Sequence, residues 1–291
     1  MNSTKKIIRL AKNAGFCYGV KRAVDLSIKI KKENPDEQVY ILGQLIHNNQ
    51  VIDQLNSLGI KTIDEIPDKI DGTCIIRTHG ATPQTITELK AKGCKIIDAT
   101  CPDVKRVQDK AQDLSKEGYQ VIIIGKADHP EVIGIKAYAD LNAENEAIVI
   151  SSKEEVLKYI SLIKNSKKIG IVIQTTQLVE NFKEILPIIA EYAKELKLYN
   201  TICHATHKRQ LAAKELAKEV DLMIVVGSKN SANTTHLAEI ISTITDAIHI
   251  ETYEELDLHM SLIEKAQKIG VTAGASTPDY VIDDVVKKVG D

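Results

Sequence analysis

Short apolar runs alternate with longer amphipathic stretches from one end of the chain to the other. Runs such as QVIIIG and DLMIVVG are strand-sized and almost continuously apolar, which is typical of strands buried on both faces of a parallel sheet. Their alternation with helices predicts the α/β class. We expect strands at residues 6–11, 38–43, 73–78, 95–100, 120–125, 147–151, 168–174, 197–202, 221–227, 247–251 and 268–274.

Three amphipathic stretches have the apolar spacing of a helix, and each begins shortly after a cysteine. VKRAVDLSIKIKKE follows Cys17, VKRVQDKAQDLSKEG follows Cys101, and KRQLAAKELAKEV follows Cys203. Pro102 is a favoured residue for a first helical turn. We therefore expect all three sulfur atoms to lie near helix N-termini, where the macrodipole favours the thiolate over the thiol.

A Lys-Arg pair follows each of these cysteines, four and five residues after Cys17 and Cys101 and five and six after Cys203. The common phase predicts one unit used three times, with boundaries at 1–98, 99–199 and 200–291. We expect three pseudo-equivalent α/β units with mainly parallel sheets around a central cavity. Three thiolates at one centre would leave a metal site one ligand short of four. The pairs themselves are expected to be solvated or to form salt bridges.

The repeat extends to polar residues at the ends of predicted strands. Strands end at Gly43, Gly125 and Gly227, and polar groups stand four and six residues further on in each unit. The last strand of each unit is followed by further polar groups. Ligands bind at the carboxyl ends of strands in parallel sheets, so these residues are expected to surround one cavity. They are His47, Asn49, His79, His129, Glu131, Thr175, Thr176, Ser231, Asn233 and Ser276.

Composition narrows the class of protein. The 291 residues suffice for two or three small domains, and a net charge of −2 gives no basic footprint for nucleic acid or an anionic membrane. The apolar runs are too short for a signal peptide or a membrane span, so we expect a cytoplasmic protein. Five cysteines without a C-x-x-C pair argue against a disulfide framework. Cys74 and Cys94 lack the Lys-Arg continuation and are expected to be structural.

An anionic substrate would have to be held by local groups, because the chain has no basic patch. His47, His79 and His129, with serine, threonine and asparagine beside them, have the donors to hold a phosphate. Glu131 is the only carboxylate at the repeated loop positions. Opposite an anion, an acid is useful mainly as a proton carrier, which is the role we expect for Glu131. The GSKNSAN segment lacks the pattern of a phosphate-binding P-loop.

With these residues in view, the chain resembles the 4-hydroxy-3-methylbut-2-enyl diphosphate reductase family, iron–sulfur enzymes of the non-mevalonate isoprenoid pathway. The resemblance covers essentially the whole chain, and several motifs in the family's order make it specific. One departure is Ala232, where the family often has a second serine. The motifs are GFCYGVKRAV, IHN, THG, DATCP, HPEV, QTT, VVGSKNSAN and VTAGASTPD.

The resemblance implies that Cys17, Cys101 and Cys203 ligate a [4Fe–4S] cluster in a cavity between the three units. It implies that Thr175 and Glu131 lie near the substrate hydroxyl. The residues implied to bind the diphosphate are His47, His79, His129, Ser231, Asn233 and Ser276, with Thr175 as a further substrate contact.

The implied reaction is a reductive dehydroxylation of (E)-4-hydroxy-3-methylbut-2-enyl diphosphate to isopentenyl and dimethylallyl diphosphate. Electrons would come from ferredoxin or flavodoxin, and we expect a monomer or weak dimer. Two alternatives remain open. Another three-cysteine iron–sulfur enzyme of quinolinate-synthase type would not explain this His, Ser and Asn set. A non-catalytic zinc scaffold would need a fourth ligand such as His204.

Overall fold

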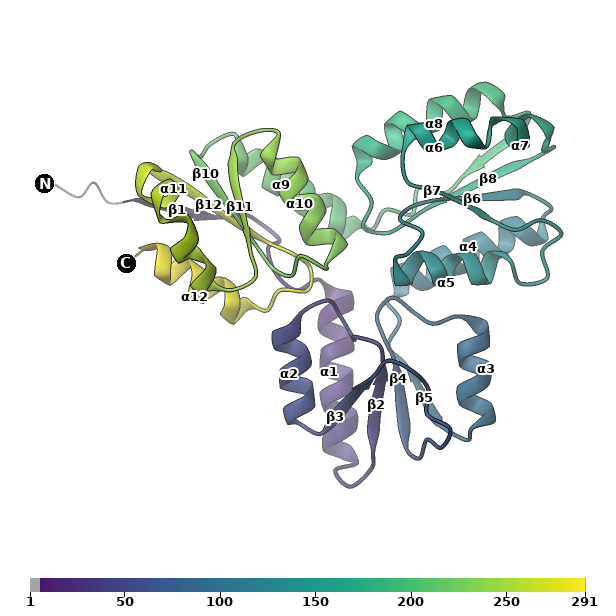
Figure 1. The fold of residues 1–291 in the computed structure, drawn as a ribbon, viewed down its shortest axis with the longest axis horizontal. Helices are drawn as coiled ribbons and strands as arrows, with labels where there is room; N and C mark the ends of the chain where they lie inside the picture. Colours follow the sequence, from purple (N-terminus) through teal and green to yellow (C-terminus); the bar gives the residue numbers. More distant parts are fainter. Residues whose placement is uncertain (1–5, 291) are drawn as a thin grey trace, which may run out of the picture. The chain divides into compact units, whose positions relative to one another are not determined.

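The strands form three four-stranded sheets in which every pair of neighbours is parallel (Figure 1). This computed structural model describes residues 6–290. The parallel sheets confirm the predicted α/β class. The strands are β1 (Ile7–Leu10), β2 (Val39–Leu42), β3 (Ile60–Ile63), β4 (Thr73–Ile76), β5 (Lys95–Asp98), β6 (Gln120–Ile124), β7 (Ile148–Ile150), β8 (Ile169–Ile173), β9 (Leu196–Leu198), β10 (Leu222–Val226), β11 (Asp246–Ile250) and β12 (Lys268–Ala273).

Helices connect the strands, and three of them begin directly after Cys17, Cys101 and Cys203, which confirms the predicted positions. Pro102 is the first residue of its helix, as expected from its fixed φ angle. No helix within residues 6–290 combines the length and apolar character needed to cross a membrane. The helices are α1 (Tyr18–Glu33), α2 (Asn49–Ser57), α3 (Pro83–Ala91), α4 (Pro102–Lys116), α5 (Pro130–Ala139), α6 (Lys153–Lys158), α7 (Ile160–Asn165), α8 (Val179–Tyr192), α9 (His204–Ala217), α10 (Ala232–Ser242), η1 (Tyr253–His259), α11 (Met260–Lys265) and α12 (Asp279–Gly290).

One strand order recurs in all three sheets, with two central strands between two edge strands. The orders are β3-β2-β4-β5, β7-β6-β8-β9 and β11-β10-β12-β1. The predicted repeat is therefore present in the hydrogen-bonded topology. The last sheet is completed by the N-terminal strand, because Ile7 of β1 pairs with Lys268 of β12 and Leu10 pairs with Val271.

The described residues divide into two compact units. The first unit contains residues 6–21, 46–54 and 204–290 and carries the sheet of β1, β10, β11 and β12. The second contains residues 22–45 and 55–203 and carries the other two sheets. The boundaries 1–98, 99–199 and 200–291 remain a prediction, but β1 pairs outside the segment that they assign to it.

Side chains of successive strand residues alternate between two apolar layers, which is why the strand sequences are almost continuously apolar. Val121 and Ile123 of β6 pack in a layer with α4 and α5. Ile122 and Ile124 pack on the opposite face with α6, α7 and α8. Figure 1 shows these two helical layers on either side of the sheet. The same layering holds the carboxyl ends of the strands in place.

The sequence pattern misses one strand and overextends another. It does not predict β3 (IKTI), an edge strand paired with β2, because Lys61 and Thr62 interrupt its apolar residues. The predicted strand at 197–202 ends at Leu198. Beyond it, the Thr201 hydroxyl accepts a hydrogen bond from the Ile173 N–H at 2.8 Å and donates one to the Ile173 carbonyl. A side chain thus replaces the backbone pairing of the expected strand.

Candidate active site

Each predicted ligand cysteine lies in a loop between an edge strand and a helix. Strand β1 leads to Cys17, β5 to Cys101 and β9 to Cys203. The cysteine N–H in each loop donates to a carbonyl two residues beyond the end of the neighbouring central strand, so the three loops share one backbone arrangement. The acceptors are Ala275 after β12 at 3.2 Å, Thr78 after β4 at 3.0 Å and Thr175 after β8 at 3.0 Å.

The chemistry of these three cysteines fits a metal centre. None of the three is in a disulfide, and all three are partly accessible. Cysteine sulfur is a good ligand for iron and zinc, and each of the three stands directly before a helix. Cys74 and Cys94 are buried instead, as predicted for structural residues, and burial raises the pKa of the Cys74 thiol to about 12. Three thiolates rather than five are therefore suited to ligate an iron–sulfur cluster.

Glu131 and Thr175 form a buried hydrogen-bonded pair between α5 and the end of β8. The Thr175 N–H donates to one carboxylate oxygen of Glu131 at 2.6 Å, and the Thr175 hydroxyl donates to the other at 2.8 Å. Glu131 is 1% exposed. Burial raises the pKa of Glu131 to about 7, although the two Thr175 hydrogen bonds oppose the rise and the Asp103 carboxylate adds to it. This carboxyl group can therefore gain or lose a proton near neutral pH.

Two predicted histidines lie beside this pair. His129 caps the N-terminus of α5, and its Nδ1 accepts the backbone N–H of Glu131 at 3.1 Å. The neutral ring then carries its proton on Nε2, which is a hydrogen-bond donor. The His79 and His129 rings meet edge to face, with their centroids 5.2 Å apart. The second unit thus brings His79, His129, Glu131 and Thr175 to the carboxyl ends of its strands.

The first unit gathers a second group of predicted residues at the start of α10. Ser231 and Asn233 are 6% and 5% exposed, and the Asn233 Nδ2 has no hydrogen-bond partner among the described residues. The Ser276 hydroxyl donates to the carbonyl of His47 at 3.1 Å and lies 3.5 Å from the Ser231 hydroxyl. A helix N-terminus with a buried, unsatisfied amide donor is a favourable place for an anion.

The comparisons with known proteins cover the same elements. The family model described as LytB protein matches residues 8–290. The chain belongs to the LytB family. A relative from Clostridium tetani, named 4-hydroxy-3-methylbut-2-enyl diphosphate reductase, is 47% identical over 97% of this chain, which spans 43% of that longer protein. A relative of the same name from Geobacter metallireducens is 42% identical over 97% of this chain and 96% of its own length.

Two solved structures resemble this LytB-family chain. One is described as (E)-4-hydroxy-3-methyl-but-2-enyl diphosphate reductase, the terminal enzyme of the non-mevalonate pathway. It is 41% identical with a TM-score of 0.71, and the match covers 98% of this chain and 99% of that one. The other is E-1-hydroxy-2-methyl-but-2-enyl-4-diphosphate reductase from Plasmodium falciparum, 28% identical with a TM-score of 0.87, covering 97% and 87%. These matches confirm the family resemblance predicted from the motifs.

The Lys-Arg pairs of the LytB-family chain lie in different environments. Lys105 and Arg106 form the expected salt bridges within α4, with Asp109 and Asp103 respectively. Arg209 is 2% exposed, so its side chain does not lie on a solvated helix face. Its Nη2 donates to the Gly15 carbonyl at 2.7 Å. The sequence carries no local signal for this contact, because the partner lies in a distant loop.

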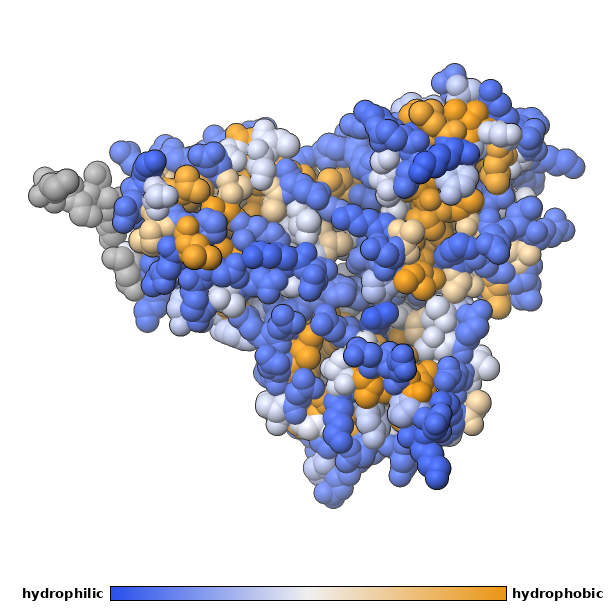
Figure 2. Space-filling view, viewed as in Figure 1, coloured by the Kyte–Doolittle hydropathy of each residue, from blue (hydrophilic) through white to orange (hydrophobic). Residues whose placement is uncertain are grey.

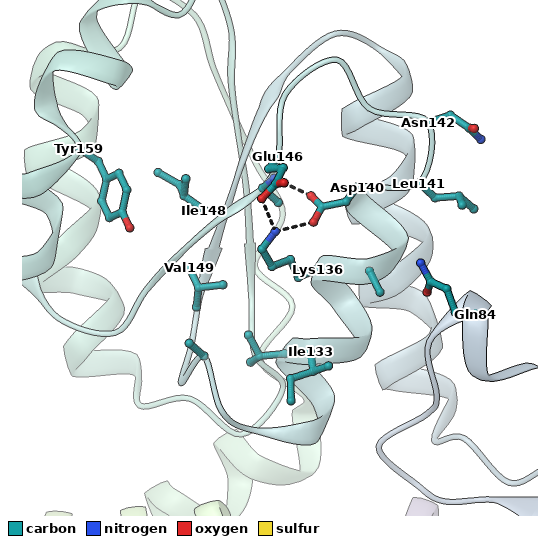
Figure 3. Close-up of a pocket in the computed structure, with 14 residues that line it drawn as sticks. Gln84, Ile133, Lys136, Asp140, Leu141, Asn142, Glu146, Ile148, Val149 and Tyr159 are labelled. Carbon is teal, nitrogen blue, oxygen red and sulfur yellow. Dashed lines mark hydrogen bonds and ion pairs between the residues drawn. The ribbon is translucent and has the colours of Figure 1, made fainter. Parts of the chain in front are cut away.

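A cavity of about 700 Å³ beside α5 and β7 is separate from these residues (Figure 3). At its polar end, Lys136 pairs with the carboxylates of Asp140 and Glu146. Figure 2 shows apolar side chains gathered over this region, and Ile133 beside the cavity is 47% exposed. Because the lysine is neutralised and none of the predicted site residues lines the cavity, we do not assign the anionic substrate to it.

Proposed function

We propose that this LytB-family protein reduces (E)-4-hydroxy-3-methylbut-2-enyl diphosphate to isopentenyl and dimethylallyl diphosphate. The observation that carries the proposal is the match over nearly the whole chain to relatives named for this reductase activity. The reaction consumes two electrons and two protons, breaks the C–O bond of the allylic hydroxyl and releases water. The protein therefore needs an anion site, a proton source and an electron-carrying group.

The anion site is assigned to the polar residues at the strand ends. Hydroxyl, amide and imidazole groups donate hydrogen bonds and can hold a diphosphate in a chain whose net charge is −2. The unsatisfied Nδ2 of Asn233 and the start of α10 are the observations that support this assignment. Binding the diphosphate would orient the remote allylic carbon for reaction. The residues are His47, His79, His129, Thr175, Ser231, Asn233 and Ser276.

Cys17, Cys101 and Cys203 are assigned as the ligands of a [4Fe–4S] cluster. When bound, a cluster with three protein ligands supplies electrons and an iron atom that acts as a Lewis acid. Glu131 holds a proton near neutral pH, and the Thr175 hydroxyl is bonded directly to its carboxyl group. We assign these two residues to deliver the proton that converts the leaving hydroxyl into water.

The remaining assignments concern the surroundings of the reaction. A small one-electron carrier, ferredoxin or flavodoxin, would supply the electrons one at a time. A cytoplasmic location and a monomer or weak dimer complete the proposal. The electron carrier follows from the family resemblance, and the charge balance favours neither nucleic acid nor an anionic membrane as a partner.

Anaerobic purification followed by iron, sulfide and zinc analysis tests the proposed cofactor. We expect a brown protein with iron and sulfide, and a colourless zinc protein would favour the scaffold alternative. Reduction of the allylic diphosphate with a chemical electron donor tests the reaction. A brown protein that leaves this substrate unchanged would favour another three-cysteine iron–sulfur enzyme.

The variant Glu131→Gln tests the proton source. We expect it to keep iron and bind substrate but to lose about 100-fold or more in turnover, which is the usual contribution of a positioned acid. The matched control is Glu154→Gln, because Glu154 is an exposed residue in the first turn of α6. Full turnover in Glu131→Gln would remove Glu131 from the mechanism.

A further inference from the structure

The Lys-Arg pairs after the three cysteines are part of the repeat, yet the proposed reaction does not use them. Cations near the start of a helix oppose the helix dipole, so their repetition at three helices calls for another reason. The contacts of the three arginines supply one. Two of them bind the backbone of a loop that leads to a different cysteine.

Arg209, which follows Cys203 in sequence, contacts the loop that leads to Cys17. Its Nη2 donates to the Gly15 carbonyl at 2.7 Å, and the side chain is buried. Gly15 has a φ of +86°, and an added Cβ would lie 2.9 Å from Asp279 Oδ1. The loop therefore has little room to move at the point where the guanidinium holds it, two residues before the thiol.

Arg22, which follows Cys17, contacts the loop that leads to Cys101. Its Nη1 donates to the Thr100 carbonyl at 3.2 Å and its Nη2 to the Asp98 carbonyl at 3.5 Å. The Asp98 side chain also accepts the Thr100 N–H at 2.9 Å. One planar guanidinium thus bridges two carbonyls of the turn immediately before Cys101.

Arg106, which follows Cys101, provides the contrast. Its guanidinium pairs with Asp103 at 3.1 Å in the same helix, and its side chain is 54% exposed. The loop before Cys203 is held instead by Thr201, through its bonds to Ile173 of β8. Thr201 thus restrains the loop before Cys203 without a contact from Arg106.

We infer that Arg22 and Arg209 are positioning residues that fix the loops carrying Cys101 and Cys17. This inference rests on the proposed cluster. Each arginine places a permanent cation one or two residues from a ligand thiolate and restrains the loop that presents it. Groups behind a metal ligand typically change metal affinity 10-fold to 100-fold, and local charge changes the potential of an iron–sulfur cluster.

The test uses the anaerobically purified full chain and three variants, Arg209→Gln, Arg22→Gln and the matched control Arg106→Gln. We expect amide hydrogen exchange at residues 11–17 to become about tenfold faster in Arg209→Gln alone. Exchange at residues 98–101 should become about threefold faster in Arg22→Gln alone, because its contacts are longer and more exposed. Iron loss to a chelator should accelerate about tenfold in Arg209→Gln.

Because the arginines are positively charged, the reduction potential of the proposed cluster is a second quantity to measure. The cluster potential should become more negative in both Gln variants and return toward the parent value in Arg22→Lys and Arg209→Lys. An exchange increase spread over the whole chain, or equal effects in Arg106→Gln, would overturn the inference. If Arg209→Gln fails to fold, the hydrogen exchange and cluster potential of the variants at the exposed Arg22 test the inference on their own. A chain without iron would refute the proposed cofactor, while the exchange pattern would still decide the positioning role.

Discussion

The hydroxyl of Thr175 can be removed without removing its backbone contact to Glu131, which allows the proton source to be tuned rather than deleted. In Thr175→Val, the N–H at 2.6 Å from one carboxylate oxygen remains, and the hydroxyl at 2.8 Å from the other is lost. Both hydrogen bonds hold the pKa of Glu131 down against the effect of burial. Removing one of them should therefore raise the pKa further.

The size of the change follows from the strength of the lost bond. A hydrogen bond to a charged group contributes about 1.5 to 3 kcal/mol. The protonated carboxyl also loses its contact with the hydroxyl, so the lower end of that range applies. About 1.5 kcal/mol corresponds to about one pKa unit. Because Glu131 is 1% exposed, little solvent screening reduces this value.

The assay is the pH dependence of kcat, measured anaerobically with a chemical electron donor. In the parent protein, kcat should fall as pH rises above about 7, where Glu131 loses its proton. In Thr175→Val, the fall should begin about one pH unit higher, whatever the absolute rate. Thr175→Ser retains the hydroxyl and should leave the midpoint unchanged. A midpoint that stays fixed or moves to lower pH in Thr175→Val would refute the argument.

Three further predictions use other measurements. Because the pKa of Glu131 rises from 4.5 to about 7 on folding, this group costs stability as pH rises through that window. Urea unfolding should show Glu131→Gln gaining about 3 kcal/mol over the parent between pH 4.5 and pH 8, and a pH-independent difference would contradict the shift. Asn233→Ala should raise KM about tenfold, since its unpartnered Nδ2 is assigned to bind the anion; an unchanged KM would remove it from the anion site. Gly227→Ala should lower the free energy of unfolding by about 2 kcal/mol, because φ is +134° and the new Cβ would lie 2.3 Å from Thr277 Oγ1; calorimetry showing parent stability would contradict this.

Much of the fold could be predicted because strands buried on both faces leave a continuous apolar sequence. The runs around Val121 to Ile124 contribute side chains to two packed layers, so each residue is apolar. The pattern reports burial but does not identify the neighbouring strand. The pairing of β1 with β12 therefore could not be predicted from the pattern. The half-exposed edge strand β3 has no continuous apolar run and was not predicted at all.

Local sequence also predicts functional positions better than it predicts their properties. Glu131 stands out by its offset from a strand-ending glycine, but its high pKa comes from burial in the folded chain and is held down in part by Thr175, which is brought close by the pairing of β6 with β8. Arg209 has the sequence context of a solvated helix residue. Its burial depends on Gly15, which comes from the opposite end of the chain. Such long-range contacts carry no periodic pattern.

The pairing of β1 with β12 has a consequence for the order of events during synthesis. The sheets of β2 to β5 and of β6 to β9 use consecutive strands, so each can form once its own segment has left the ribosome. The loop of Cys17 must wait for Ala275, the acceptor of its backbone N–H. The loop of the first thiol to be translated is thus fixed only after Ala275 has been translated, and the proposed three-thiol centre can be completed only then.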